Sequence, residues 1–170
     1  MKNKLCAVGG TLLCTVAFSA CASSESTIPN DPEYLSDEVI AADDTQEQEE
    51  LKRILHQIFE DAKNKNIKAL RASHLVTPKF SKFGPRVPHR QDAETTNQEE
   101  AAFVSSFDKL DAEIIDPKVD IFGNVAIVTY YLKSVLTYGT EVKSGSRRGT
   151  LVFVRTKDGW RIVHEHTSQT

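Results

Sequence analysis

Apolar residues recur every three or four positions after residue 48. Thr45 and Gln48, just before this series, have the spacing of a helix capping box. The apolar positions of the series are Leu51, Ile54, Leu55, Ile58, Phe59 and Ala62. Such spacing places the side chains on one face of a helix, so a long amphipathic helix is predicted from Thr45. Asn66 is a good N-cap residue and predicts a short second helix through Leu70.

The segment 75–95 has neither a helical nor a strand period. It is interrupted by Pro78, Gly84, Pro85 and Pro88. We therefore expect an irregular connection. Its two aromatic residues, Phe80 and Phe83, alternate with basic residues, and the segment is either a lid over a pocket or an ordinary connection. After it, Thr96 and Glu99 form a second capping box, which predicts a third helix.

The last third of the chain has the pattern of β-strands. The predicted strands span residues 110–121, 124–137, 148–157 and 160–168. The turn sequences Phe122-Gly123-Asn124 and Lys157-Asp158-Gly159 are short, so the strands that they join should be antiparallel neighbours. Residues 139–145 are expected to form a wider turn.

Two of these strands are apolar on both faces. On the strand 124–137, one face carries Val125, Ile127, Thr129 and Tyr131, and the other carries Ala126, Val128, Tyr130 and Leu132. An antiparallel sheet with one face in water would instead alternate apolar and polar residues. The helices can cover one face. We expect a second copy of the chain to cover the other, which predicts a homodimer.

The N-terminus is predicted to be a lipoprotein signal peptide. Two lysines precede the uncharged, apolar stretch 5–18, which is too short to span a bilayer and has the length of a signal-peptide core. The sequence Phe18-Ser19-Ala20-Cys21 resembles the lipobox of bacterial lipoproteins. Residues 1–20 would then be removed, and Cys21 would anchor the mature chain in a lipid membrane. The alternative is an ordinary secretory signal cut before Cys21, with this cysteine incidental.

Residues 21–44 are predicted to be an acidic, flexible tether. The stretch 22–50 contains ten acidic residues and no Lys or Arg, whereas the whole chain has a net charge of −3. Of the three cysteines, only Cys21 lies outside the predicted signal peptide, so the mature chain would have no disulfide. Ala22 is not the Asp of the familiar inner-membrane retention signal. We therefore expect a lipid-anchored protein of the cell envelope, in the outer membrane and facing the periplasm.

The end of the chain resembles a known family. Helices come first, an antiparallel sheet comes last, and the last strand contains Trp160-x-Ile162-Val163-His164-x-His166-x-Ser168. Over residues 45–170, this combination resembles the SnoaL-like branch of the nuclear transport factor 2-like superfamily. The resemblance implies an α+β, cystatin-like fold: N-terminal helices packed on a curved antiparallel sheet, a cone with an internal pocket, and dimers that pack sheet to sheet. The kinase hub domains of the superfamily have an arginine where this chain has Thr167, which weakens any expectation of carboxylate capture.

His164 and His166 are the main candidates for a polar site. They lie two positions apart on one predicted strand and therefore share a face. They could bind zinc, or one could be a pocket base, but we favour histidines that only hydrogen-bond their neighbours. A zinc site needs three or four ligands, no third ligand is evident, and His74 or Glu141 would be guesses. No metal site is therefore predicted.

Three functions fit these features. We favour a lipoprotein whose pocket binds a small, partly apolar ligand, with Tyr131 and Trp160 as candidate contacts beside the two histidines, although Trp160 also fits a core or dimer position. An accessory or oligomerisation module is the second. The alternative is a small isomerase, dehydratase or cyclase that uses a pocket His or an acidic base. No acid–base pair is evident in the sequence, so no catalytic residue and no cofactor is predicted, and an exported protein is not expected to bind nucleic acid.

Overall fold

The computed structural model describes residues 35, 37–41, 45–85 and 87–170. The predicted signal peptide at 1–20 and most of the predicted tether at 21–44 lie outside these residues. Within the tether, the described part forms a short helix, α1 (Asp37–Ala41). No helix of the described ranges is long and apolar enough to cross a membrane.

Three further helices form the first half of the domain: α2 (Thr45–Lys63), α3 (Ile67–Ser73) and α4 (Ala93–Ser106). The prediction of a long amphipathic helix is confirmed, because Leu51 and Leu55 of α2 are fully buried. Asn66 caps α3 as predicted, with its side chain accepting a hydrogen bond from the backbone N–H of Ala69.

The start of α4 differs from the prediction. Asp92, and not Thr96, is the N-cap residue, and its carboxylate accepts a hydrogen bond of 2.8 Å from the backbone N–H of Thr95. Asp is as good an N-cap as Thr, so the helix begins one turn earlier. Thr96 consequently lies inside the helix and is fully buried.

Six strands form one sheet in the order β2-β1-β6-β5-β4-β3. Their bounds are β1 (Ser81–Gly84), β2 (Val87–Gln91), β3 (Lys109–Phe122), β4 (Val125–Tyr138), β5 (Glu141–Thr156) and β6 (Gly159–Gln169). The four long strands are sequential antiparallel neighbours, which confirms the prediction from the turns.

Two predictions about the strands were wrong. Residues 75–95 are not irregular throughout, because they contain the β1–β2 hairpin, and β1 pairs in parallel with β6. Backbone hydrogen bonds to β6 hold this short hairpin in place. Its strands can therefore form without a regular alternation of apolar and polar residues. Residues 139–145 are not a wide turn either. Gly139 has a positive φ of 58° and allows a tight turn, so that β5 begins at Glu141.

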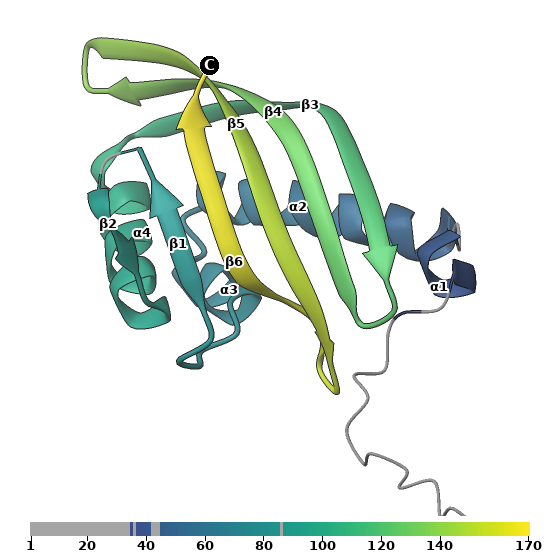
Figure 1. Cartoon of the computed structure of the whole chain (residues 1–170). Helices are drawn as coiled ribbons and strands as arrows, with labels where there is room; N and C mark the ends of the chain where they lie inside the picture. The colour runs from purple at the N-terminus through teal and green to yellow at the C-terminus, as the bar shows by residue number, and fades with distance from the viewer. Residues whose placement is uncertain (1–34, 36, 42–44, 86) are drawn as a thin grey trace, which may run out of the picture. The chain divides into compact units, whose positions relative to one another are not determined.

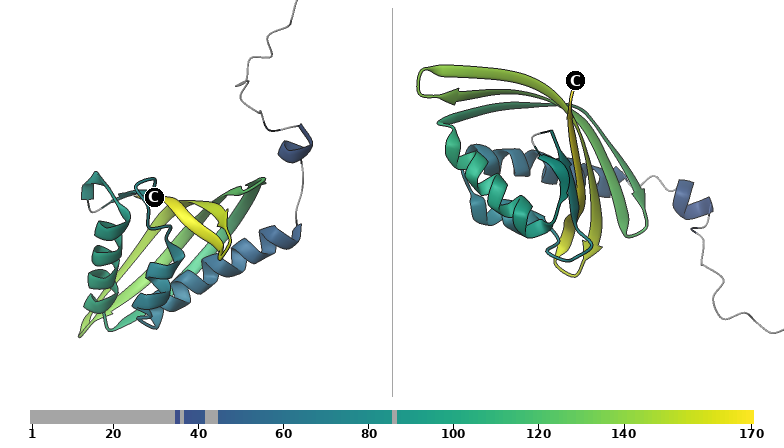
Figure 2. Two further views of the ribbon diagram at one scale, coloured as in Figure 1. Left: turned by 90° about the horizontal axis from the view of Figure 1, so that it is seen from below. Right: turned by 60° about the vertical axis from the view of Figure 1, so that its left-hand side comes forward.

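The sheet bends around the helices, with α2 running across its concave face (Figures 1 and 2). This arrangement confirms the α+β fold with helices packed on a curved sheet. The core lies between the two layers. Its buried residues on the central strands include Ala126, Val128, Tyr130, Leu132, Leu151 and Phe153. A second cluster, under α3 and α4, contains Leu70, Val104, Phe107, Leu110 and Leu136.

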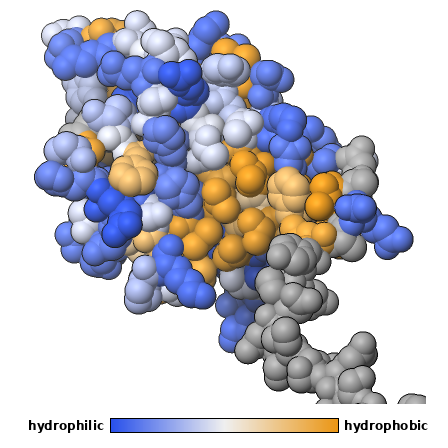
Figure 3. Space-filling model, in the orientation of Figure 1, coloured by the Kyte–Doolittle hydropathy of each residue, from blue (hydrophilic) through white to orange (hydrophobic). Residues whose placement is uncertain are grey.

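The outer face of the sheet also carries apolar side chains, as predicted. In the register of β4 and β5, Val125 lies opposite Val154 and Ile127 opposite Val152. Val125 is 38% exposed, and Figure 3 shows a continuous hydrophobic patch over this part of the sheet. We call these four residues the outer apolar patch.

Candidate functional site

A bulge in β6 decides which of its side chains face inward. Phe153 pairs with Ile162, but the preceding residue of β5, Val152, pairs with His164, so β6 has one residue more than β5 at this point. Such an extra residue shifts the alternation of side chains between the two faces. Trp160 and Ile162 are buried on the inner face, and after the bulge Glu165 is the buried residue.

The predicted site residues do not meet in one place. The bulge puts His164 and His166 on the outer face, and Tyr131 lies on that face as well, 51% exposed. The Ser81 hydroxyl lies 2.8 Å from Nδ1 of His164 and so links β1 to β6. Trp160 is buried in the core, with the Arg155 guanidinium 4.4 Å from its ring centre. None of the four predicted ligand contacts lines the cavity described next, and their binding roles stay predictions.

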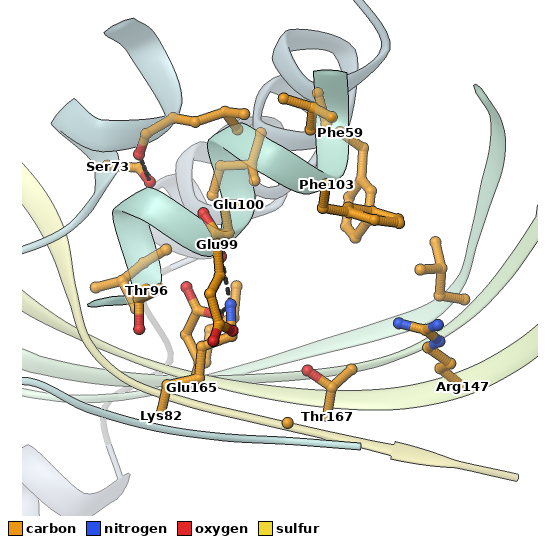
Figure 4. A pocket seen from close by; sticks show the side chains of 18 of the residues that line it. Phe59, Ser73, Lys82, Thr96, Glu99, Glu100, Phe103, Arg147, Glu165 and Thr167 are labelled. Atoms are coloured by element: carbon orange, nitrogen blue, oxygen red, sulfur yellow. Dashed lines mark hydrogen bonds and ion pairs between the residues drawn. The ribbon is translucent and has the colours of Figure 1, made fainter. Parts of the chain in front are cut away.

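A cavity of about 190 Å³ lies between the sheet and helices α2, α3 and α4. Its walls are mostly apolar and belong to both clusters of the core. They include Ile58, Phe59, Leu70, Phe103, Val104, Leu110, Leu132, Leu136 and Leu151. Figure 4 shows Glu99, Glu100, Lys82 and Glu165 together on one side of this space and Arg147 on another.

Four charged side chains form a cluster at the first of these sides, which we call the charged cluster: His74 after α3, Lys82 of β1, Glu100 of α4 and Glu165 of β6. His74 Nε2 lies 2.7 Å from Glu165 Oε1. The Lys82 ammonium donates to Glu100 and, at 2.7 Å, to Glu165 Oε2. The exposed fraction of these side chains runs from 2% for His74 to 24% for Glu100, and all four residues line the cavity.

The pKa values in the charged cluster follow from burial and from its ion pairs. Burial by itself lowers the pKa of His74, but the hydrogen bond and charge of Glu165 outweigh it and raise the pKa above its ordinary value. Burial likewise opposes the ammonium form of Lys82, yet the two glutamates raise its pKa. Burial would raise the pKa of Glu165, but Lys82 and His74 lower it to about 2.

Glu100 behaves in the opposite way to Glu165. Burial, together with the negative charge of Glu165, raises the pKa of Glu100 in spite of the nearby Lys82 and His74. Both ring nitrogens of His74 face oxygen atoms, since Nδ1 lies 2.8 Å from Oδ1 of Asn97, and this geometry favours the imidazolium. The cluster therefore consists of two cations, one firmly ionised carboxylate and one carboxyl group that takes up a proton more readily than usual.

The same residues have the composition of a metal site. One ligand atom each from His74, Glu100 and Glu165 lies within 4.8 Å of the others. The Lys82 ammonium contacts both carboxylates, however, and already supplies the positive charge that a cation would bring. A metal ion would have to displace Lys82, and the prediction that the protein binds none is left untested by this geometry. His74 was considered only as a partner of His164, which lies on the other face of the sheet.

Two further residues shape the cavity wall. Tyr130 pairs with Gly149 across the β4–β5 ladder, and a Cβ atom at position 149 would overlap the Tyr130 ring. The glycine thus gives the ring room to lie flat on the sheet. Thr96 of α4 lines the cavity and is 0% exposed, and its hydroxyl has no hydrogen-bond partner among the described residues.

Sequence reasoning missed most of this site. Glu165 stands between the two histidines that were singled out, but its inward orientation depends on the bulge. Lys82 was only one of several basic residues in a segment expected to be irregular. Glu100 stands next to Glu99, which was assigned to a capping box. The one available signal was a Glu in the middle of a predicted strand, since a Glu that a strand buries requires charged partners.

The chain belongs to the SnoaL-like domain family. The model of that family matches residues 51–170, which contain most of α2, the other helices that line the cavity and the whole sheet. The resemblance seen in the sequence is thereby confirmed for this part of the chain. No curated protein sequence matches the chain.

Solved structures of the NTF2-like superfamily share this fold. A candidate dehydratase of the NTF2-like family from Streptomyces avermitilis is 20% identical, with a TM-score of 0.68, and the match covers 74% of this chain and 97% of that one. The CaMKII hub of S. rosetta is 22% identical, with a TM-score of 0.61 and coverage of 72% and 96%. A candidate scytalone dehydratase from Novosphingobium aromaticivorans is 12% identical, with a TM-score of 0.60 and coverage of 71% and 81%.

Proposed function

We propose that the domain binds a small, partly apolar molecule in the cavity of the cone. The observation that carries the proposal is a cavity with mostly apolar walls that ends at the charged cluster. Small-molecule sites are mostly apolar and fix the ligand by a few polar groups, which is the composition found here. Arg147, another charged residue of the wall, lies away from the cluster (Figure 4).

The volume of the cavity limits the size of the ligand. An engineered apolar cavity of roughly 150 Å³ is large enough to bind benzene. A space of about 190 Å³ therefore suits a molecule of one ring with a small substituent. The β1–β2 hairpin contributes Gly84, Pro85 and Val87 to the wall of the same space.

The proposal is tested by filling the cavity. Thr167 is half-buried on β6 and lines the cavity, so Thr167→Phe should occupy part of the space and abolish binding. Small molecules that copurify with the full chain would be identified by unbiased mass spectrometry, in the wild type and in the variant. Gln169→Phe is the matched control, because Gln169 is exposed on the same strand and does not line the cavity. The proposal fails if Thr167→Phe carries the same molecules as the wild type.

A second candidate function is acid–base catalysis in the same cavity. Two carboxyl groups of one site have pKa values moved in opposite directions, with Glu165 lowered and Glu100 raised. Such a pair is typical of enzymes that hold one carboxyl group ionised and use the other to transfer a proton. Two of the similar structures carry names of candidate dehydratases. In D₂O, the wild type should then exchange a carbon-bound hydrogen of a copurified ligand, and Glu100→Gln should not. Equal exchange by both proteins would exclude this role of Glu100.

We also propose that the protein is a lipoprotein of the outer membrane, anchored through Cys21 and facing the periplasm. The sequence Phe18-Ser19-Ala20-Cys21 and the following Ala22 support this proposal. Cys21→Ser should abolish incorporation of labelled palmitate and leave the precursor unprocessed, because the thiol is the acylated group. Normal palmitate labelling of the variant would contradict the proposal, and fractionation of the envelope would test the membrane assigned.

A homodimer is proposed to form through the outer apolar patch. Its four valine and isoleucine side chains lie on the face of the sheet that none of the described helices α2, α3 and α4 covers, and burying them would remove apolar surface from water. The similar structures include hub and association domains, whose names denote assembly. Sedimentation of the full chain in detergent should show a dimer, and Ile127→Lys should shift it to a monomer. A wild-type monomer at tens of micromolar would contradict the proposal.

A further inference from the structure

The charged groups at the end of the cavity already neutralise one another. His74 and Lys82 are cations and Glu165 is an anion. When Glu100 is also ionised, the four groups together have no net charge. Each of these four charges is in contact with an opposite one, and Glu99, on the same side of the cavity, accepts a hydrogen bond from Gln91. A charged ligand group placed beside them would lose its hydration without gaining an unpaired counter-ion, and burying such a charge is costly.

The charges around Glu100 disfavour ligands of either sign. A ligand carboxylate would meet Glu99 and Glu100, which both line the cavity on α4. A ligand ammonium would meet Lys82, which lines the same wall. A neutral polar group avoids both kinds of repulsion.

Two polar atoms at this end retain hydrogen-bonding capacity. Glu100 Oε1 accepts from Lys82, but Oε2 lies 3.8 Å from His74 Nε2, which is beyond a hydrogen bond. The Thr96 hydroxyl is buried without a partner in the described chain. Thr96 and Glu100 are four positions apart on α4 and therefore share one face of the helix, the face that lines the cavity.

A buried polar group without a partner is rare in proteins, and water or a bound molecule can supply the missing partner. A hydroxyl group is both a donor and an acceptor. It could donate to Glu100 Oε2 and accept from the Thr96 hydroxyl at the same time. A ketone could only accept, and an apolar ligand would leave both atoms unpaired.

We propose that the ligand is a small neutral alcohol or phenol, whose hydroxyl group binds between Thr96 and Glu100. This inference rests on the proposed function, since it names the class of molecule that the cavity takes. The ring or alkyl part lies against the apolar wall, which includes Phe59 and Phe103 (Figure 4). Thr96 and Glu100 select the ligand by its hydroxyl group.

The inference is tested with four probes of one ring each: phenol, toluene, benzoate and benzylamine. Binding to the full chain would be measured by calorimetric or NMR titration. Phenol should bind about tenfold more tightly than toluene, since one of its two hydrogen bonds is to a charged group. Benzoate and benzylamine should bind more weakly than phenol, because each brings an unpaired charge.

Variants of Thr96 separate the hydrogen bond from the shape of the cavity. Thr96→Val has nearly the same shape and removes only the hydroxyl, so it should reduce the preference for phenol, which keeps its bond to Glu100, and leave toluene binding unchanged. Thr96→Ser keeps the hydroxyl and should keep the preference. Thr129→Val, on the outer face of β4, is the matched control and should bind like the wild type.

Each other outcome overturns the inference in a distinct way. If toluene binds the wild type as tightly as phenol, the cavity binds ligands but the hydroxyl is not recognised, and the proposed function stands alone. If benzoate or benzylamine binds most tightly, the ligand is charged. If none of the four probes binds, the class of ligand named here is wrong, and the experiment with Thr167→Phe decides separately whether the cavity binds anything.

Discussion

Glu165→Ala is expected to lower the free energy of unfolding by about 3–5 kcal/mol, the usual cost of removing one partner of a buried ion pair. The residue is 7% exposed, and its carboxylate contacts both His74 and Lys82. Without it, these two cations would remain buried with Glu100 as their only anion in the cluster. Urea unfolding, followed by the fluorescence of the buried Trp160, measures the change.

Glu113→Ala is the matched control for this experiment, because Glu113 is exposed on β3 and its loss should change stability by no more than about 0.5 kcal/mol. A loss below 1 kcal/mol on Glu165→Ala would show that water reaches the two cations, and would contradict the burial of the charged cluster.

The pH dependence of stability gives a second check. The pKa of Glu165 falls from 4.5 to about 2 on folding, so its contribution is present above pH 4.5 and is lost as the pH falls through about 2. The stability advantage of the wild type over Glu165→Gln should therefore shrink over that interval.

Gly149→Ala is expected to destabilise the domain by about 1–3 kcal/mol, as overpacking of a core usually does. The new methyl group would overlap the ring of Tyr130, which is 8% exposed and packed against Phe59. The ring has to swing away from the sheet, and the space open to it is the cavity. Ligand binding should therefore weaken together with stability, as seen in thermal unfolding and in the same titrations.

Two companion variants test the cause of this effect. Gly145→Ala introduces the same methyl group on the same strand where nothing lies within 4 Å, so it should leave stability unchanged or slightly higher. In a Tyr130→Ala background, Gly149→Ala should cost much less than in the wild type, because the clashing ring is gone. Additive effects of the two substitutions would show that the clash is not the reason for the loss.

The helices and strands with regularly spaced apolar residues could be predicted from the sequence. The helix from Thr45 and the four long strands have regular apolar spacing and clear turn signals, and the structure contains all of them. The β1–β2 hairpin could not be predicted, because its strands are short and interrupted by proline and glycine. Its stability comes from pairing with β6, which is distant in the sequence.

One extra residue in β6, at the bulge, prevented the prediction of the site from the sequence. Alternation that continued from Trp160 and Ile162 would put His164 inside and Glu165 outside. The bulge reverses both positions, and no glycine or proline marks it within Ile162-Val163-His164. The alternation on β4 is uninterrupted, and there the prediction that Tyr130 and Tyr131 lie on opposite faces of the sheet is confirmed. Burial of a Glu also depends on partners from other segments, which one strand cannot reveal.

The topology of the sheet also sets the order in which the domain can fold. The turns between the four long strands contain two residues each, so these hairpins join neighbours in the sequence and form early. His74 and Glu165 are 91 positions apart, and the pairing of β1 with β6 spans a similar distance. Closing so long a loop is slow, because its entropy is lost before the contacts form. The charged end of the cavity is therefore expected to be completed last, after the hairpins have formed.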